Sequence, residues 1–362
     1  PGRRVPQRAA GRPRALVGNL SVVDELAAHL AVDRGHASPL WTTLFGTDDA
    51  ARVADRLLAH LGGEVGPARS VSFARSGVGV VAGFDLEDDR RVVLKVHRWK
   101  VTVDRLVAVQ EAQVAMADAG IPAPRPIGRA TSWGSGVATS EEFRSGDSAD
   151  GHDPAVRRSV ADGLEALVRA GRHLDPVPDV GPAALDTDHD DLWPEPHDLR
   201  FDFDATAEGA EWIDELAIGA VEVLAAHPQP PMVAHLDWRV ENLGFRGDQI
   251  VAIYDWDSLA LTSEAVAVGH ASASFSTDWA RAGFDGLPSV QEMQAFVTDY
   301  EERRGRSFDA TARAVVEAAN LRLCAHGARC QHSDVVLVPE LAADPDSGWL
   351  GLLRLRAPAG LW

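Results

Sequence analysis

The stretch VAHLDWRVENLGFRGDQIVAIYDWDS, residues 233–258, carries two carboxylates and an amide at the ends of two short apolar segments. A Gly-Asp pair at 247–248 separates the segments and is typical of a hairpin turn, so we expect Asn242 and Asp255 to meet at its open end. Mg2+ binds oxygen ligands of this kind together with phosphate oxygens. Phosphoryl transfer from ATP needs such an ion, a lysine on the phosphates and a carboxylate, here Asp237, that orients the acceptor hydroxyl. The stretch therefore indicates phosphoryl-transfer chemistry.

The spacing His-x-Asp-x-x-x-x-Asn at His235, Asp237 and Asn242, followed by a strand that ends in Asp-Trp-Asp at 255–257, resembles the aminoglycoside phosphotransferase family. The resemblance implies an α+β, bilobal, protein-kinase-like fold that uses ATP or GTP and Mg2+. It implies that Asp237 is the catalytic base and that Asn242 and Asp255 bind the metal. His235 would be a structural member of the catalytic loop.

A kinase-like site also needs a strand lysine that is paired with a helix glutamate and contacts the nucleotide phosphates. The chain has two lysines, Lys95 and Lys100, and Lys95 lies in the apolar run 92–96, which predicts a strand. Glu111 is the one carboxylate away from the ends of the helix predicted for residues 104–119. We therefore expect a Lys95–Glu111 pair at the phosphates.

Two further segments are expected at the nucleotide. Ser76 and Gly77 begin the sequence Ser-Gly-Val-Gly and would offer backbone N–H groups to phosphate, with a plain hairpin turn as the alternative. Residues 137–146 resemble the connector between the two lobes of the family. The resemblance implies that the backbone near Glu142 and Phe143 contacts the adenine.

The pattern of helices and strands predicts three parts. Residues 1–65 would form a basic tail and an N-terminal helical extension, and residues 66–145 a nucleotide-binding N-lobe built on a small antiparallel β-sheet. Residues 146–362 would form a larger helical C-lobe with the catalytic loop and the acceptor site. The resemblance covers residues 70–280. It leaves two roles open for the extension, which would either pack on the small lobe or extend a lid over the substrate.

The composition excludes several classes of partner. The net charge of −19 argues against nucleic acid, because phosphate contacts need a basic face. No apolar run reaches 18 residues, so we expect no membrane span. Two cysteines, Cys324 and Cys330, form no disulfide framework, which suits the cytoplasm, and we expect both to be small core residues.

The acceptor side has weaker candidates. Asp257 and Glu264, with Asp202 and Asp204, would bind amines of a cationic substrate, the alternative being a solvated acidic surface. Trp238 and Trp256 would stack on a sugar ring, the alternative being core packing. The family usually carries an aspartate about a dozen residues after the Asp-Trp motif, and this chain reads Ala-Val-Ala-Val-Gly-His at 265–270. The departure separates it from the best-known antibiotic-modifying members.

These observations predict an ATP- and Mg2+-dependent O-phosphotransferase for a small hydroxylated molecule. The acceptor would be an aminoglycoside-like antibiotic, as in antibiotic resistance, or a metabolic amino alcohol or sugar. The segment after residue 257 leaves little room for an activation loop, which argues against a protein kinase. The remaining alternative is a kinase-like module that binds a nucleotide or metabolite without catalysis. The oligomeric state stays open.

Overall fold

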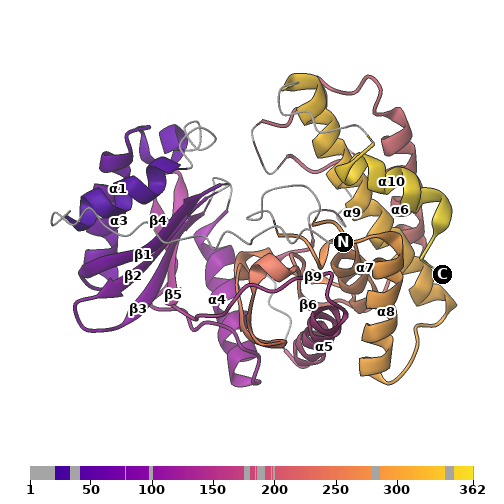
Figure 1. The fold of residues 1–362 in the computed structure, drawn as a ribbon, viewed down its shortest axis with the longest axis horizontal. Coiled ribbons are helices and arrows are strands. Elements are labelled where there is room, and N and C mark those ends of the chain that lie inside the picture. Colours follow the sequence, from indigo (N-terminus) through magenta and orange to yellow (C-terminus); the bar gives the residue numbers. More distant parts are fainter. Residues whose placement is uncertain are drawn as a thin grey trace, which may run out of the picture.

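The computed structural model describes residues 21–32, 41–77, 79–97, 101–174, 180–183, 185, 192–196, 198, 200–278, 286–338 and 346–361. The expected basic tail and Lys100 lie outside these residues. The chain forms two lobes, a small one around a β-sheet and a larger one made mainly of helices (Figure 1). The expected α+β, bilobal arrangement is confirmed.

The small lobe is built on a five-stranded antiparallel sheet in the order β1-β2-β3-β5-β4. Its strands are β1 (Ala68–Ser76), β2 (Val80–Leu86), β3 (Arg91–His97), β4 (Thr131–Trp133) and β5 (Gly136–Glu142). Side chains alternate between the two faces of a strand. On β3 the apolar residues Val92, Leu94 and Val96 therefore share one face, and Lys95 and His97 share the other.

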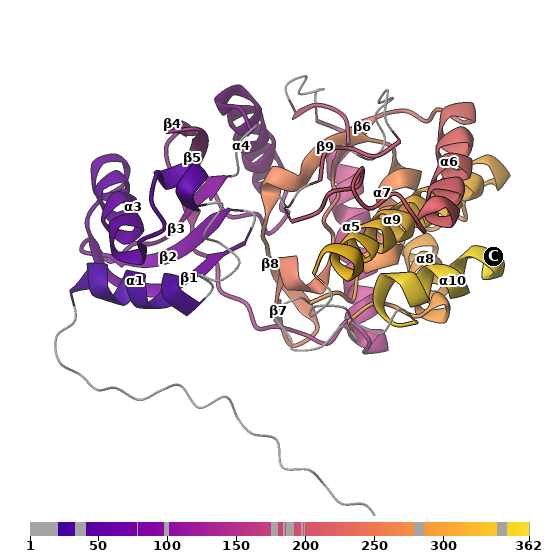
Figure 2. The same ribbon diagram turned by 90° about the horizontal axis from the view of Figure 1, so that it is seen from above.

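The N-terminal extension covers the apolar face of this sheet. It consists of α1 (Val22–Val32), a helical turn at 41–45 and α3 (Ala50–Glu64), which begins at the capping carboxylate of Asp49. Leu26, Trp41 and Leu57 are fully buried in one core with the sheet. Figure 2 shows α1 and α3 against the sheet on the side away from the large lobe. The extension is thus part of the small lobe.

Helix α4 (Val103–Asp118) lies on the polar face of the sheet, between it and the large lobe. Thr102 caps its first turn by accepting a hydrogen bond from the Arg105 N–H. The helix ends at Asp118, and Gly120, two residues later, has a φ of +90° that favours glycine. A proline-containing segment then leads to β4 and β5, so α4 and β5 bracket the polar face around Lys95.

In the large lobe, the long helix α9 packs against α6, α7 and α10, and every residue of α7 from Ala265 to Ser274 is buried. The helices are α5 (Pro154–Gly171), α6 (Glu211–Ala226), α7 (Glu264–Ser274), α8 (Val290–Arg304), α9 (Ala310–Leu337) and α10 (Gly348–Ala359). Two small antiparallel pairs lie at its edge, β6 (Met232–His235) with β9 (Leu259–Thr262), and β7 (Leu243–Arg246) with β8 (Gln249–Ile253). No helix among the described residues is both long and apolar enough to span a membrane.

The packing of the extension predicts a stability difference within one helix. Leu57→Ala on α3 removes a fully buried side chain and should lower the free energy of unfolding by about 2–5 kcal/mol. Asp55→Ala, on the exposed side of the same helix, should change it by less than about 0.5 kcal/mol. Denaturant titration of both variants measures the difference. Equal stabilities would contradict the assignment of the extension to the small-lobe core.

The two thiols lie in the core of the large lobe, and burial raises the pKa of each to about 12. Because the thiolate is the nucleophile, neither Cys324 nor Cys330 should react with iodoacetamide at neutral pH in the folded protein. Both should be alkylated in denaturant, as intact-mass spectrometry would show. Glutathione in the same tube is the control for reagent activity. Rapid alkylation of the native protein would contradict the burial of the two thiols.

Candidate active site

The hairpin β7–β8 brings Asn242 and Asp255 together, as the sequence predicts. Leu243 pairs with Ile253, and the Tyr254 N–H donates to the Asn242 carbonyl at 2.8 Å. Asp255 follows with φ 61° and ψ 46°, a left-handed conformation that aspartate tolerates better than most residues. Non-glycine residues in this region often occur at functional sites. The local fold therefore places the Asn242 amide and the Asp255 carboxylate at one end of the hairpin.

Asp237 is held by a hydrogen bond on one carboxylate oxygen and an ion pair on the other. Asn242 Nδ2 donates to Asp237 Oδ2 at 2.8 Å and to the Asp237 carbonyl at 2.9 Å. The Arg239 guanidinium lies 3.0 Å from Asp237 Oδ1. Because the Asn242 nitrogen is committed to Asp237, the amide oxygen is the atom of Asn242 that remains for a cation. Arg239 was not among the residues that the sequence singled out.

His235 is fully buried, as suits the structural role predicted for it. Its Nε2–H donates to the Tyr254 carbonyl at 2.8 Å, and its Nδ1 lies 3.0 Å from the Ser258 hydroxyl. Burial lowers the pKa of His235, although the Tyr254 carbonyl and nearby carboxylates oppose this effect. The ring thus ties β6 to the segment that carries Asp255, and both of its nitrogens are engaged within the protein.

Lys95 contacts carboxylates from both lobes. Its Nζ lies 3.1 Å from Glu141 Oε1 on β5 and 3.9 Å from Asp255 Oδ1 in the large lobe. Burial alone would lower the pKa of Lys95, but the carboxylates of Glu141, Asp255 and Asp257 outweigh it and raise the pKa. The ammonium is therefore charged and lies at the junction of the lobes.

The expected Lys95–Glu111 pair is wrong. Glu111 lies on the exposed side of α4, and the residues that α4 turns toward the sheet are Gln110 and Gln113. Lys95 is directly opposite Thr139, so Glu141, two residues farther along β5, lies on the same face of the sheet. Alternation along two paired strands was the signal that could have identified Glu141.

A cavity of about 430 Å3 lies between the lobes, and several of the charged and polar residues described above line it. Lys95, Glu141, Asn242 and Asp255 line it. Its wall is otherwise partly apolar and aromatic, with contributions from Phe73, Val81, Val93, Phe143 and Tyr254. Ring-lined pockets with a few convergent polar groups are typical of small-molecule sites. The residues predicted from distant segments thus meet around one cavity.

The predicted phosphate loop is engaged within the protein. The Ser76 hydroxyl accepts a hydrogen bond from Trp41 Nε1 at 2.7 Å, and the Gly77 N–H donates to the Gly79 carbonyl at 3.0 Å. Neither residue lines the cavity, whereas Arg75, one residue earlier, does. The geometry therefore favours the plain hairpin turn for Ser76 and Gly77. Arg75 is a cationic residue that the sequence argument missed.

The predicted connector borders the cavity through Glu141 and residues 143–146, including Phe143 but not Glu142. Arg91 stacks on the Phe143 ring with its guanidinium carbon 3.8 Å from the centroid. The N–H groups of Glu142 and Phe143 donate to the Arg125 and Arg91 carbonyls, at 2.8 and 3.0 Å. Both N–H groups are therefore engaged within the protein. A nucleotide base bound in the cavity would therefore hydrogen-bond to carbonyl groups of this segment or to backbone groups after Phe143.

A comparison with protein families matches the phosphotransferase enzyme family over residues 75–306, which is more than half of the chain. The chain belongs to the phosphotransferase enzyme family. A sequence search finds no match among curated proteins.

Solved structures share the fold of this phosphotransferase-family chain. Amicoumacin kinase hAmiN, in complex with AMP-PNP, Ca2+ and Ami, has a TM-score of 0.60 and 10% identity over 80% of this chain and 89% of that one. The apo form of a thermostable mutant of the aminoglycoside phosphotransferase APH(4)-Ia has a TM-score of 0.51 and 16% identity, covering 83% and 99%. Spectinomycin phosphotransferase APH(9)-Ia has a TM-score of 0.50 and 12% identity, covering 83% and 92%. At such identities the likeness shows the fold.

The acidic acceptor candidates of this phosphotransferase-family chain already have partners. Asp257 Oδ2 lies 3.2 Å from His97 Nδ1 across the lobe junction. Burial alone would raise the pKa of Asp257, but the bond to His97 outweighs it and holds the pKa well below its usual range. Glu264 is bound by Arg172, by Arg304 at 2.7 Å and by the Tyr300 hydroxyl at 2.8 Å. Both Glu264 oxygens are engaged, so Glu264 does not bind an amine as expected, whereas Asp257 Oδ1 is buried without a hydrogen-bond partner among the described residues.

The aromatic acceptor candidates are core residues. Trp238 and Trp256 are each 1% exposed, and their indole N–H groups donate to the Val160 and Ile253 carbonyls. Stacking on a sugar is excluded by this burial. Asp202 and Asp204 are exposed, in a segment where the Asp202 N–H donates to Ser333 of α9. Their surroundings suit the solvated surface.

The contacts of Glu264 predict a structural role. Glu264→Ala would leave the nearly buried Arg304 without its carboxylate and should lower the free energy of unfolding by about 3 kcal/mol. Glu302→Ala, at an exposed position one helix away, should have an effect below about 0.5 kcal/mol. Thermal and denaturant unfolding compare the two. A Glu264→Ala protein with native stability would reopen the substrate-binding assignment.

Proposed function

We propose that the protein is an ATP- and Mg2+-dependent O-phosphotransferase for a small hydroxylated molecule. The observation that carries the proposal is the meeting of Lys95, Asn242 and Asp255 around one cavity, with Asp237 hydrogen-bonded to Asn242 beside it. A cation, a pair of hard oxygen ligands and an orienting carboxylate are the groups that phosphoryl transfer requires. GTP would fit the same set of groups.

The residues present fit a magnesium ion. The Asn242 amide oxygen and the Asp255 carboxylate are hard oxygen donors, the kind that Mg2+ prefers. The charge of the adjacent Asp257, together with burial, raises the pKa of Asp255 well above its ordinary value. A cation at Asp255 would offset that repulsion. When bound, the ion neutralises charge on the phosphate oxygens.

The protein groups divide the remaining work. Lys95 binds the nucleotide phosphates, and the apolar wall around Val81, Val93 and Phe143 receives the base. Asp237 accepts the proton of the acceptor hydroxyl as that oxygen forms a bond to the γ-phosphorus. The bond from the γ-phosphorus to the bridging oxygen breaks, and the nucleoside diphosphate leaves with that electron pair. Contacts from Asn242 and Arg239 fix the orientation of Asp237. Such orientation of the reacting groups provides much of the catalysis in phosphoryl transfer.

A small acceptor is favoured over a protein. After Asp257 the chain passes through β9 and enters α7 at Glu264, so no long activation segment separates them. The net charge of −19 attracts cationic molecules, which supports an amine-bearing acceptor such as an aminoglycoside-like compound or an amino alcohol. Amicoumacin kinase in complex with Ami and spectinomycin phosphotransferase in complex with spectinomycin, both of this fold, are in keeping with a small acceptor here. Two free thiols suit the cytoplasm.

Asp237→Asn tests the catalytic role. The amide keeps the shape but cannot accept the proton, so kcat should fall at least about a hundredfold in a coupled assay over a panel of aminoglycosides, amino sugars and amino alcohols. ADP affinity should stay within about threefold, since Asp237 does not line the cavity.

The matched control is Asp248→Asn, an exposed carboxylate at the turn of the same hairpin, which should have normal kcat. Undiminished transfer by Asp237→Asn would show that the centre of the site is misassigned. Nucleotide binding without transfer to any acceptor would favour the non-catalytic module.

A further inference from the structure

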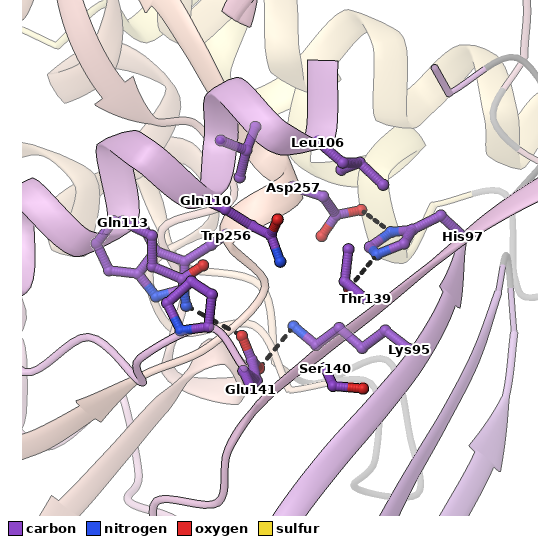
Figure 3. A pocket seen from close by; sticks show the side chains of 12 residues that line it. Lys95, His97, Leu106, Gln110, Gln113, Thr139, Ser140, Glu141, Trp256 and Asp257 are labelled. Atoms are coloured by element: carbon purple, nitrogen blue, oxygen red, sulfur yellow. Dashed lines mark hydrogen bonds and ion pairs between the residues drawn. The ribbon is translucent and has the colours of Figure 1, made fainter. Parts of the chain in front are cut away.

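The acidic partner of Lys95 comes from the sheet and not from a helix. Figure 3 shows Lys95 and Glu141 pointing toward one another on the face that α4 covers. Both residues are 8% exposed, and Lys95 Nζ lies 3.1 Å from Glu141 Oε1. They belong to β3 and β5, which are hydrogen-bonded neighbours. The spacing of the pair is therefore set by the ladder of one sheet.

Helix α4 contributes an amide to this pair. Gln113 Nε2 donates to Glu141 Oε2 at 3.0 Å (Figure 3). It also donates to the Pro124 carbonyl at 2.7 Å. Both oxygens of the Glu141 carboxylate are thus bonded, one to Lys95 and one to Gln113. A buried carboxylate with both oxygens satisfied has a fixed orientation.

Asp255 is the second carboxylate near Lys95, at 3.9 Å. A lysine that lost Glu141 would gain by moving onto Asp255, because a buried ammonium needs a carboxylate partner. Asp255 is also a proposed ligand of the metal. Lys95 and the cation would then compete for one carboxylate.

We propose that Glu141 is the positioning residue of Lys95, holding the ammonium toward the nucleotide phosphates and away from Asp255, with Gln113 as its hydrogen-bond donor. This inference rests on the proposed function. It predicts that pairing of β3 with β5 fixes the position of the Lys95 ammonium. That position then does not depend on a charged side chain of α4.

Glu141→Gln tests the inference, and Glu111→Gln on the exposed side of α4 is the matched control. Fluorescent ADP is titrated into each protein with and without Mg2+. Glu141→Gln should weaken ADP binding roughly tenfold to a hundredfold, the loss expected for a charge-assisted hydrogen bond. The Mg2+ concentration for half-maximal ADP binding should also rise. Glu111→Gln should match the wild type in both measurements.

Glu141→Asp is the variant to use if Glu141→Gln does not fold. It keeps the charge but shortens the side chain, so it should also weaken ADP binding.

The outcomes separate the inference from the proposed function. Wild-type affinity and Mg2+ dependence in Glu141→Gln, or in folded Glu141→Asp, would overturn the positioning role while leaving the phosphotransferase standing. Absence of ADP binding by the wild-type protein would instead refute the proposed function. Unfolding curves for every variant show that folded proteins are being compared.

Discussion

A buried ammonium between two carboxylates is the interaction on which the site depends. Lys95 is held by Glu141 of the small lobe and approached by Asp255 of the large lobe. Removing a charge from water is costly unless it is paired and hydrogen-bonded. This requirement ties the register of β3 and β5 to the geometry of the hairpin that ends at Asp255. The two lobes therefore meet around Lys95, where the proposed function places the phosphates of the nucleotide.

The small lobe supplies a rigid support for that ammonium. One face of its sheet is sealed by the N-terminal extension, whose Trp41 and Leu57 are fully buried. The opposite face carries the polar residues of the site, including His97, which bonds to Asp257 in the large lobe at 3.2 Å and to Thr139 at 2.8 Å. Apolar and polar residues alternate along β3, so the same strand contributes to the core and to the cavity.

Local patterns in the sequence predicted much of this arrangement. The two-lobed α+β fold, the small antiparallel β-sheet and the hairpin at 243–253 follow from short-range periodicity and turn residues. The spacing of Asp237, Asn242 and Asp255 is likewise local, because all three lie within 19 residues of sequence, 237–255. Residues close in sequence and joined by one hairpin have few other ways to meet.

Partners from distant elements could not be predicted in the same way. Glu111 was chosen as the only mid-helix carboxylate, but the turn of α4 that faces the sheet carries Gln113, and the acid comes from β5. Glu264 resembled a free acceptor ligand until the fold supplied Arg304, and Asp257 gained His97 as the partner of one carboxylate oxygen. Each error concerns which side of an element faces the protein, and that is decided by tertiary packing.

The most direct test of the account is a crystal structure with AMP-PNP and Mn2+, in which the anomalous signal of manganese locates the metal. The account predicts a manganese peak bound by the Asn242 amide oxygen and the Asp255 carboxylate, and Lys95 in contact with the nucleotide phosphates while still paired with Glu141. A nucleotide bound outside the cavity between the lobes, or manganese away from Asn242 and Asp255, would contradict it.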